Sequence, residues 1–253
     1  MTAEERKRFN KELMELAIPL ALQRLLTALV GASDALMLGR LTQDAIAAVS
    51  LANQISFIMS LFTGAVIGSA GVLAAQYWEK RDFANTKRFL GMAIRYAACI
   101  AIIFFIPAFL ISNRLMAIFT SEPELIRIGS EYLRIVSFSY IFTGIAECFL
   151  MLMRVSGFAR ISVWISAVTV TIDMTADLFL IYGIGPFPAL GANGSAWSTI
   201  CVEAIALVWC LIWSGRKQEV RITLKEVFFF SKTFEKTSGK LFLACSAAAF
   251  PGG

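Results

Sequence analysis

The chain has 253 residues, 58% of them hydrophobic and only 16% charged, and its net charge is +5. A soluble domain carries about 25% charged residues, so this composition excludes an ordinary soluble globular protein. The basic residues form no face with interleaved aromatic side chains, which argues against nucleic-acid binding. The sequence contains no histidine, phosphate-binding loop, Ser–His–Asp set or metal-ligand spacing, so it does not predict an enzyme or a cofactor.

Apolar runs of about 20 residues or more, separated by charged clusters, predict an all-α integral membrane protein. Before the first run, residues 1–12 carry no small-residue cleavage site, so we expect a retained terminus rather than a signal peptide. Residues 216–253 are expected to form a tail, because their apolar piece near 241–250 is too short to cross a bilayer. Between these ends we expect a six-helix bundle over residues 13–215, with spans near 13–38, 46–77, 89–112, 124–153, 161–182 and 191–213.

Turn chemistry predicts where several of these helices begin and end. Asp82 is placed to cap the helix that precedes the third span. The fourth span opens with the letters SEPE at 121–124, a capping-box pattern with a proline in the first turn. Gly183 follows the fifth span, and the loop GIGPFPALG after it contains two prolines that prevent the helix from continuing.

The distribution of Lys and Arg predicts the orientation of the bundle. Basic residues are concentrated before the first span, in the second-to-third and fourth-to-fifth connections, and after the sixth span. The alternate connections hold only Arg40 and Arg114. By the positive-inside rule both termini are therefore expected to be cytoplasmic, in a multi-pass protein of the plasma membrane.

Two carboxylates stand within the apolar fifth span. Asp173 and Asp177 are four residues apart, and with Ser166 and Thr169 they form a polar stripe along one helical face. A carboxylate at mid-membrane costs about 2.5–3.5 kcal/mol, which makes each one a functional hypothesis. Two such groups cannot both be ionised at low cost, so we expect the pair to hold H⁺ or Na⁺. The structural alternative is a protonated aspartate that only hydrogen-bonds a neighbouring helix.

Other polar residues in the spans are candidates for an ion site or a cavity wall. Asp34, beside three small residues near the outer end of the first span, fits an ion site or contact with headgroup water. Glu147 fits either a cavity or the cytoplasmic interface. Ser and Thr often bond only their own backbone in membrane helices, so the stripes are candidates for lining alone. The cavity or substrate candidates are Asn53, Glu147, Ser166, Thr169, Ser195, Thr199 and Glu203.

Three stretches together resemble the multidrug and toxic compound extrusion (MATE) family over about residues 13–215. They are SDALMLGRLTQDAIAAVSLANQI at the end of the first span, AQYWEKRDFANTKR after the second, and DMTADLFLIYGIGPFPALGANGSAWST across the fifth and sixth. The resemblance implies the N-lobe of a twelve-helix antiporter that exports lipophilic or cationic drugs in exchange for H⁺ or Na⁺. Residues from about 226 onward do not resemble the family, so the matching C-lobe or a second chain is expected to be needed for transport.

The resemblance also implies roles for the acids. Asp34, Asp173 and Asp177 fall on family positions associated with H⁺ or Na⁺ binding, although position 173 is usually asparagine in that family. One alternative is a non-transporting half of such a protein. Another is a flippase for lipid-linked precursors, which is expected to have a strongly basic cavity, to which only Arg24 and Arg95 could contribute here.

Overall fold

The computed structural model describes residues 14, 18, 21–22, 25–26, 28–217, 221 and 224–227. Within these residues the chain is α-helical and contains no strand, which confirms the predicted all-α class. The predicted terminus at 1–12, most of the tail at 216–253, and Arg24 lie outside the described residues.

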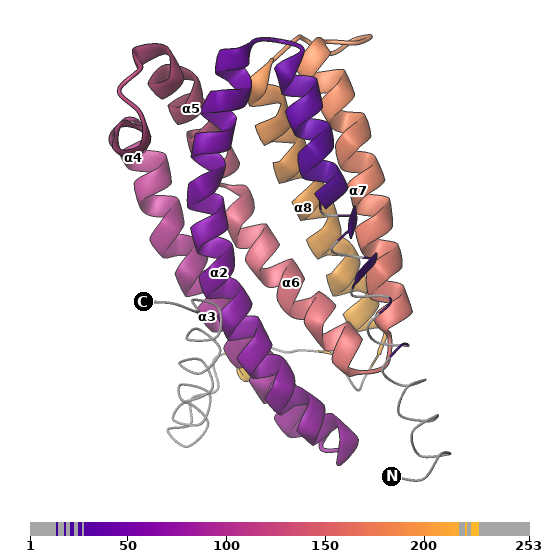
Figure 1. Ribbon diagram of the computed structural model, residues 1–253. Helices are drawn as coiled ribbons and strands as arrows, with labels where there is room; N and C mark the ends of the chain where they lie inside the picture. Colours follow the sequence, from indigo (N-terminus) through magenta and orange to yellow (C-terminus); the bar gives the residue numbers. More distant parts are fainter. Residues whose placement is uncertain are drawn as a thin grey trace.

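Long helices run side by side along the molecule (Figure 1). α2 packs against α3 and α5, α3 packs against α6, and α8 packs against both α6 and α7. The first helix lies beside α7 and α8. In chain order the helices are Ala28–Gly39, α2 (Gln43–Glu79), α3 (Phe83–Leu110), α4 (Ser112–Phe119), α5 (Pro123–Val136), α6 (Ser139–Val155), α7 (Ala159–Tyr182), α8 (Ala192–Gly215) and α9 (Leu224–Val227).

Four helices of the described part, α2, α3, α7 and α8, are long and apolar enough to cross a membrane. α5 and α6 together make a fifth span, bent by 48° where an unbroken helix over 124–153 was predicted. Two serines flank the bend, and the hydroxyls of Ser137 and Ser139 donate to the carbonyls of Arg134 and Val136 at 2.9 and 2.8 Å. Such bonds to the preceding turn bend helices. Only Ala28–Gly39 of the predicted first span is described as a helix, so the expected count of six is approximate.

The predicted helix ends are correct where a side chain or a glycine controls them. Asp82 Oδ1 accepts from the backbone N–H of Asn85 at 3.1 Å, as expected of a cap. Gly183 ends α7 in the left-handed region, with φ of 70°. The capping box at 121–124 was wrong: α5 begins after Glu122 without a side-chain cap, and Thr120 Oγ1 accepts the Glu122 N–H instead.

The interior and the outer surface are both apolar, as expected of a bundle in lipid. One buried cluster joins α2, α3, α6 and α8, and a second joins α2, α3 and α5 with Leu38 of the first helix. Large apolar side chains also cover the outside, among them Ile103, Leu110, Val208 and Ile212. These exposed side chains match the hydrocarbon that surrounds membrane-spanning helices.

Candidate functional site

A hydrogen bond fixes the first helix beside α7 near the predicted ion site. Tyr182, the last residue of α7, donates its hydroxyl to the backbone carbonyl of Met37 at 2.8 Å. Met37 lies one helical turn after Asp34, so this bond sets the height of Asp34 against α7. Residues 145 positions apart in the chain are therefore held together at the edge of the site.

The acids that meet are Asp34 and Asp177. Their side chains are neighbours, each carboxyl group within interaction range of the other. Two carboxylates this close cannot both be ionised at low cost, which favours a proton or a cation between them. Asp177 is 1% exposed. The Oδ1 atom of each residue is buried and has no hydrogen-bond partner among the described residues. Buried polar atoms are normally satisfied, so two orphaned oxygens at one contact mark a place for a proton or a small cation.

Asp173 has a different partner, although it lies only one turn before Asp177. The Ser198 hydroxyl on α8 lies 3.0 Å from Asp173 Oδ1 and 3.2 Å from the Asp173 carbonyl, and it can donate to either. The close approach of α7 and α8 makes this contact possible. A Cβ added to Gly194 on α8 would lie 2.6 Å from the Leu180 carbonyl oxygen on α7.

Two tyrosines on the bent span connect the site to α2. Tyr132 of α5 donates to Asn53 Oδ1 at 3.3 Å, and Tyr140 of α6 shares a 3.0 Å hydrogen bond with Ser56. Both tyrosines are almost fully buried. The sequence predicts Asn53 as a cavity residue but predicts neither tyrosine nor Ser198. Its only signal for the tyrosines was an aromatic polar residue inside an apolar run, which packing explains equally well.

A cavity of about 160 Å³ opens between α6, α7 and α8, with Val30 of the first helix on its wall. Three carboxylates line it, from Glu147, Asp173 and Glu203, together with Ser166 and Thr169. No Lys or Arg is among the lining residues. The cavity therefore combines an acidic wall with apolar side chains, and Asp173 belongs to both the cavity and the α7–α8 contact.

The acids of this cavity are held differently. Glu203 lies close to Thr143 of α6, whose hydroxyl donates to the Ser139 carbonyl of its own helix at 2.9 Å. Glu147 faces Arg154 of the same helix at 3.8 Å and is 43% exposed, so much of its charge is screened by its surroundings. Glu203 consequently has the less compensated charge of the two.

The structure does not bring every candidate into the cavity. Ser195 is 1% exposed and is not among the lining residues. Thr199 donates its hydroxyl to the Ser195 carbonyl at 3.0 Å, a bond within its own helix. The hydroxyl of Thr169 also donates to its own helix, although its side chain remains on the cavity wall.

The three aspartates do not form a single three-carboxylate cluster. Within the described ranges, no group of three or more acidic or cysteine side chains is arranged to hold a metal ion. A sodium ion would therefore need backbone or hydroxyl oxygens besides the Asp34–Asp177 carboxyls. A proton needs only the two neighbouring carboxyl groups.

Comparison with known proteins identifies relatives over most of the chain. A family model described as MatE matches residues 19–178. A probable multidrug resistance protein NorM from Agrobacterium fabrum is 22% identical over 211 residues, which cover 83% of this chain and 45% of that protein. The multidrug resistance protein PmpM from Pseudomonas aeruginosa is 25% identical, with 81% of this chain and 43% of that protein covered. The chain thus spans a little under half the length of these relatives.

Solved structures share the arrangement of helices. A multidrug resistance MATE family transporter of the MOP superfamily, in an outward-facing conformation, aligns with a TM-score of 0.80 at 19% identity. The alignment covers 93% of this chain and 51% of that transporter. At this level of identity the likeness establishes the fold alone.

Proposed function

This chain belongs to the MatE family, and on that premise we propose that it forms the ion-coupling lobe of a cation-driven exporter of lipophilic organic cations. The observation that carries the proposal is the buried contact between Asp34 and Asp177, with an unpartnered oxygen on each side chain. A shared proton, or a sodium ion in its place, removes one of the two negative charges of this pair when no drug is bound. We propose that both ends of the chain face the cytoplasm, as the distribution of basic residues predicts.

The acidic cavity supports cationic substrates. Glu203, Asp173 and Glu147 supply negative charge, and the surrounding apolar side chains suit a lipophilic molecule. Asp173 lies one turn from Asp177, so a cation held at Asp173 is close enough to repel a proton or a sodium ion from the Asp34–Asp177 pair. Binding of the drug and release of the coupling ion are then coupled, because each cation lowers the affinity for the other.

A second lobe is part of this proposal. The chain spans about half the length of the relatives that it matches, and alternating access in secondary transporters is the rocking of one repeat against the other. We propose that export requires a second six-helix lobe, supplied by the same longer polypeptide or by another chain. The described residues supply the Asp34–Asp177 acid pair and one wall of the proposed substrate pathway.

The flippase alternative receives no support from the cavity. Headgroups of lipid-linked precursors carry phosphates, which need cationic side chains. The cavity is lined by three carboxylates and by no basic residue. We therefore retain the exporter as the function that the site supports.

The proposal is tested by counting ions exchanged when a drug binds. Calorimetric titration of tetraphenylphosphonium into the purified full chain in lipid nanodiscs, in two buffers of different ionisation enthalpy, gives the number of protons released. We expect about one proton per bound cation. The Asp34→Asn/Asp177→Asn variant is expected to bind the cation with no proton release, because no carboxyl remains at the pair.

The matched control is Asp44→Asn, which removes an exposed acid from the first turn of α2 and is expected to release as many protons as the unchanged chain. If no proton is released but added sodium weakens tetraphenylphosphonium binding, the coupling ion is Na⁺. Binding that is insensitive to pH, to sodium and to the double substitution contradicts the proposed coupling.

A further inference from the structure

A cleft lies where α3 ends, α4 begins and α5 passes beside them. One part of it, of about 360 Å³, is lined by residues 109–114 and Arg134. An adjoining part, of about 450 Å³, extends along α5. The two parts share Ser112, Asn113 and Arg134. α4, the start of α5 and the end of α3 lie at the upper end of the bundle in Figure 1, and the cleft shares no lining residue with the acidic cavity.

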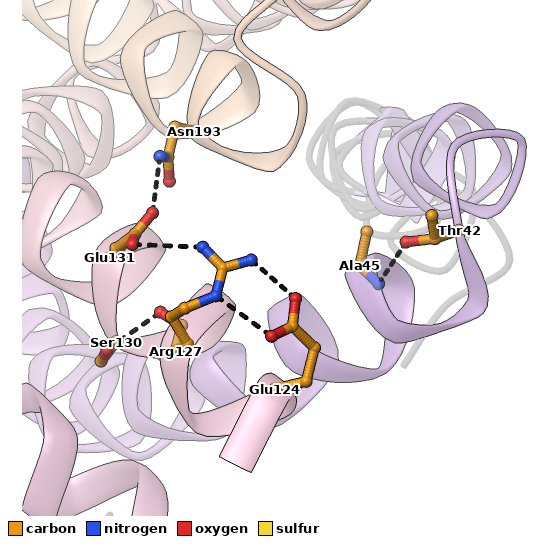
Figure 2. A network of polar contacts seen from close by, with 7 residues as sticks. All are labelled: Thr42, Ala45, Glu124, Arg127, Ser130, Glu131 and Asn193. Atoms are coloured by element: carbon orange, nitrogen blue, oxygen red, sulfur yellow. Dashed lines mark hydrogen bonds and ion pairs between the residues drawn. The ribbon is translucent and has the colours of Figure 1, made fainter. Parts of the chain in front are cut away.

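One arginine of the cleft is already matched by acids. Figure 2 shows Arg127 between two carboxylates of its own helix: Glu124 at 2.6 Å and Glu131 at 3.6 Å. Asn193, at the start of α8, donates to Glu131 from the other side at 3.3 Å. The positive charge of Arg127 is therefore compensated, and its side chain is tied into the wall.

Two other arginines of the cleft have no such compensation. Within the described part of the chain, neither Arg114 nor Arg134 forms an ion pair with a carboxylate. The guanidinium of Arg134 lies 4.9 Å from the centre of the Phe109 ring, which holds it on the floor of the cleft. Arg114 is exposed on α4 and lines the same part of the cleft.

The backbone adds partial positive charge at the same place. α4 has eight residues and begins at Ser112 without a side-chain cap, so the first N–H groups of the helix have no side-chain acceptor. Ser112 itself is only 8% exposed, yet it lines both parts of the cleft. Its hydroxyl has no hydrogen-bond partner among the residues that the structure describes. The Ser112 hydroxyl on the cleft wall is therefore available to donate to a ligand.

The rim of the cleft is apolar and lies at the end of a membrane span. Leu110 is 70% exposed and Ile118 is 74% exposed, and Ile111 between them is also exposed. α3 crosses the bilayer and ends at Leu110, so these side chains are at the boundary between hydrocarbon and headgroups. A ligand here contacts lipid tails on one side. On the other side it contacts the guanidinium groups of Arg114 and Arg134 and the first backbone N–H groups of α4.

We propose that this cleft binds the headgroup phosphate of an anionic phospholipid. The two uncompensated guanidinium groups and the uncapped start of α4 hold the phosphodiester oxygens, and the Ser112 hydroxyl donates a further hydrogen bond. The acyl chains lie along Leu110 and Ile118. A lipid at this position braces α4 against α5 and the bent span that carries Tyr132 and Tyr140.

The test is lipid binding by the purified full chain in detergent, measured by native mass spectrometry during titration with phosphatidylglycerol. We expect one saturable site in the unchanged chain. Arg114→Gln and Arg134→Gln are each expected to weaken it about tenfold, the loss of one charge-assisted hydrogen bond. Arg40→Gln, which removes a cation from the same end of the bundle but outside the cleft, is expected to change the affinity less than twofold.

Arg114→Gln decides the question if Arg134→Gln does not fold, because Arg114 is exposed and contacts no acid. Equal affinity of Arg114→Gln and Arg40→Gln overturns the proposal. A second titration with inorganic phosphate separates the sources of the ligand. If phosphate at matched concentration displaces phosphatidylglycerol, the cleft is a site for a soluble anion and the lipid proposal is overturned.

Discussion

The contact between α7 and α8 at Gly194 gives a direct test of how the candidate site is positioned. In Gly194→Ala the new Cβ lies 2.6 Å from the Leu180 carbonyl oxygen and 2.9 Å from the Ile181 nitrogen. Both are backbone atoms, so no flexible side chain can move away. Ordinary contact begins at 3.4 Å, and the two helices must therefore separate by roughly 0.8 Å at this crossing, the difference between 3.4 and 2.6 Å.

The separation also affects the site, because Ser198 lies one turn after Gly194. Its 3.0 Å bond to Asp173 Oδ1 lengthens to about 3.8 Å if the full shift reaches it, which is beyond hydrogen-bonding distance. Overpacking costs about 2–3 kcal/mol, and replacing a helical glycine by alanine returns about 1 kcal/mol. The net loss of about 1–2 kcal/mol corresponds to a melting temperature lower by roughly 2–8 °C.

Two measurements on the purified chain check this reasoning: thermal melting in detergent and equilibrium binding of tetraphenylphosphonium. The matched control is Gly68→Ala in α2, where an added Cβ meets nothing within 4 Å and the variant should melt no lower than the unchanged chain. A Gly194→Ala variant that melts with Gly68→Ala and binds the cation unchanged refutes the argument that close backbone packing positions Asp173.

Two further substitutions test neighbouring parts of the site. Tyr182→Phe removes the 2.8 Å bond to the Met37 carbonyl; it should cost about 1 kcal/mol and lower the melting temperature by about 2–4 °C, and unchanged melting would mean that this bond does not hold the first helix. Glu203→Gln should weaken tetraphenylphosphonium binding about tenfold or more, whereas Glu147→Gln should weaken it less than about threefold because Glu147 is partly exposed and faces Arg154. Equal losses in the two variants, read by equilibrium binding, contradict this ranking.

The sequence predicted helices best where the local chain controls the outcome. The cap at Asp82 and the left-handed end at Gly183 depend on residues within one turn, and both were predicted. The bend between α5 and α6 was not predicted, because serines at helical positions commonly bond the preceding turn without any bend. The capping box predicted at 121–124 shows the same limit, since the Glu124 carboxylate that the pattern assigned to the helix start bonds Arg127 instead.

The cavity wall was partly predictable. Helical periodicity indicates which residues share a helix face, but it does not indicate which helix or cavity that face contacts. Ser166, Thr169 and Asp173 were placed on one side of a helix, and all three line the same cavity. The sequence predicted Ser195 and Thr199 but not Ser198, because their four-residue spacing forms a stripe that ends at Glu203. The bond of Ser198 to Asp173 depends on how α7 and α8 cross, which a single sequence does not contain.

The fifth span contains the most consequential difference between pattern and structure. A four-residue step rotates a helix by about 40° past a full turn and raises it by about 6 Å, so Asp173 and Asp177 share a face but lie at different heights along it. Asp177 meets Asp34 of the first helix, while Asp173 meets Ser198 of α8 and the cavity. In the exporter that we propose, one of these acids binds the coupling ion and the other binds the substrate. Because only one turn separates them, a positive charge at Asp173 opposes a positive ion at the Asp34–Asp177 pair. In the exporter that we propose, this spacing supplies the competition between drug and coupling ion that antiport requires.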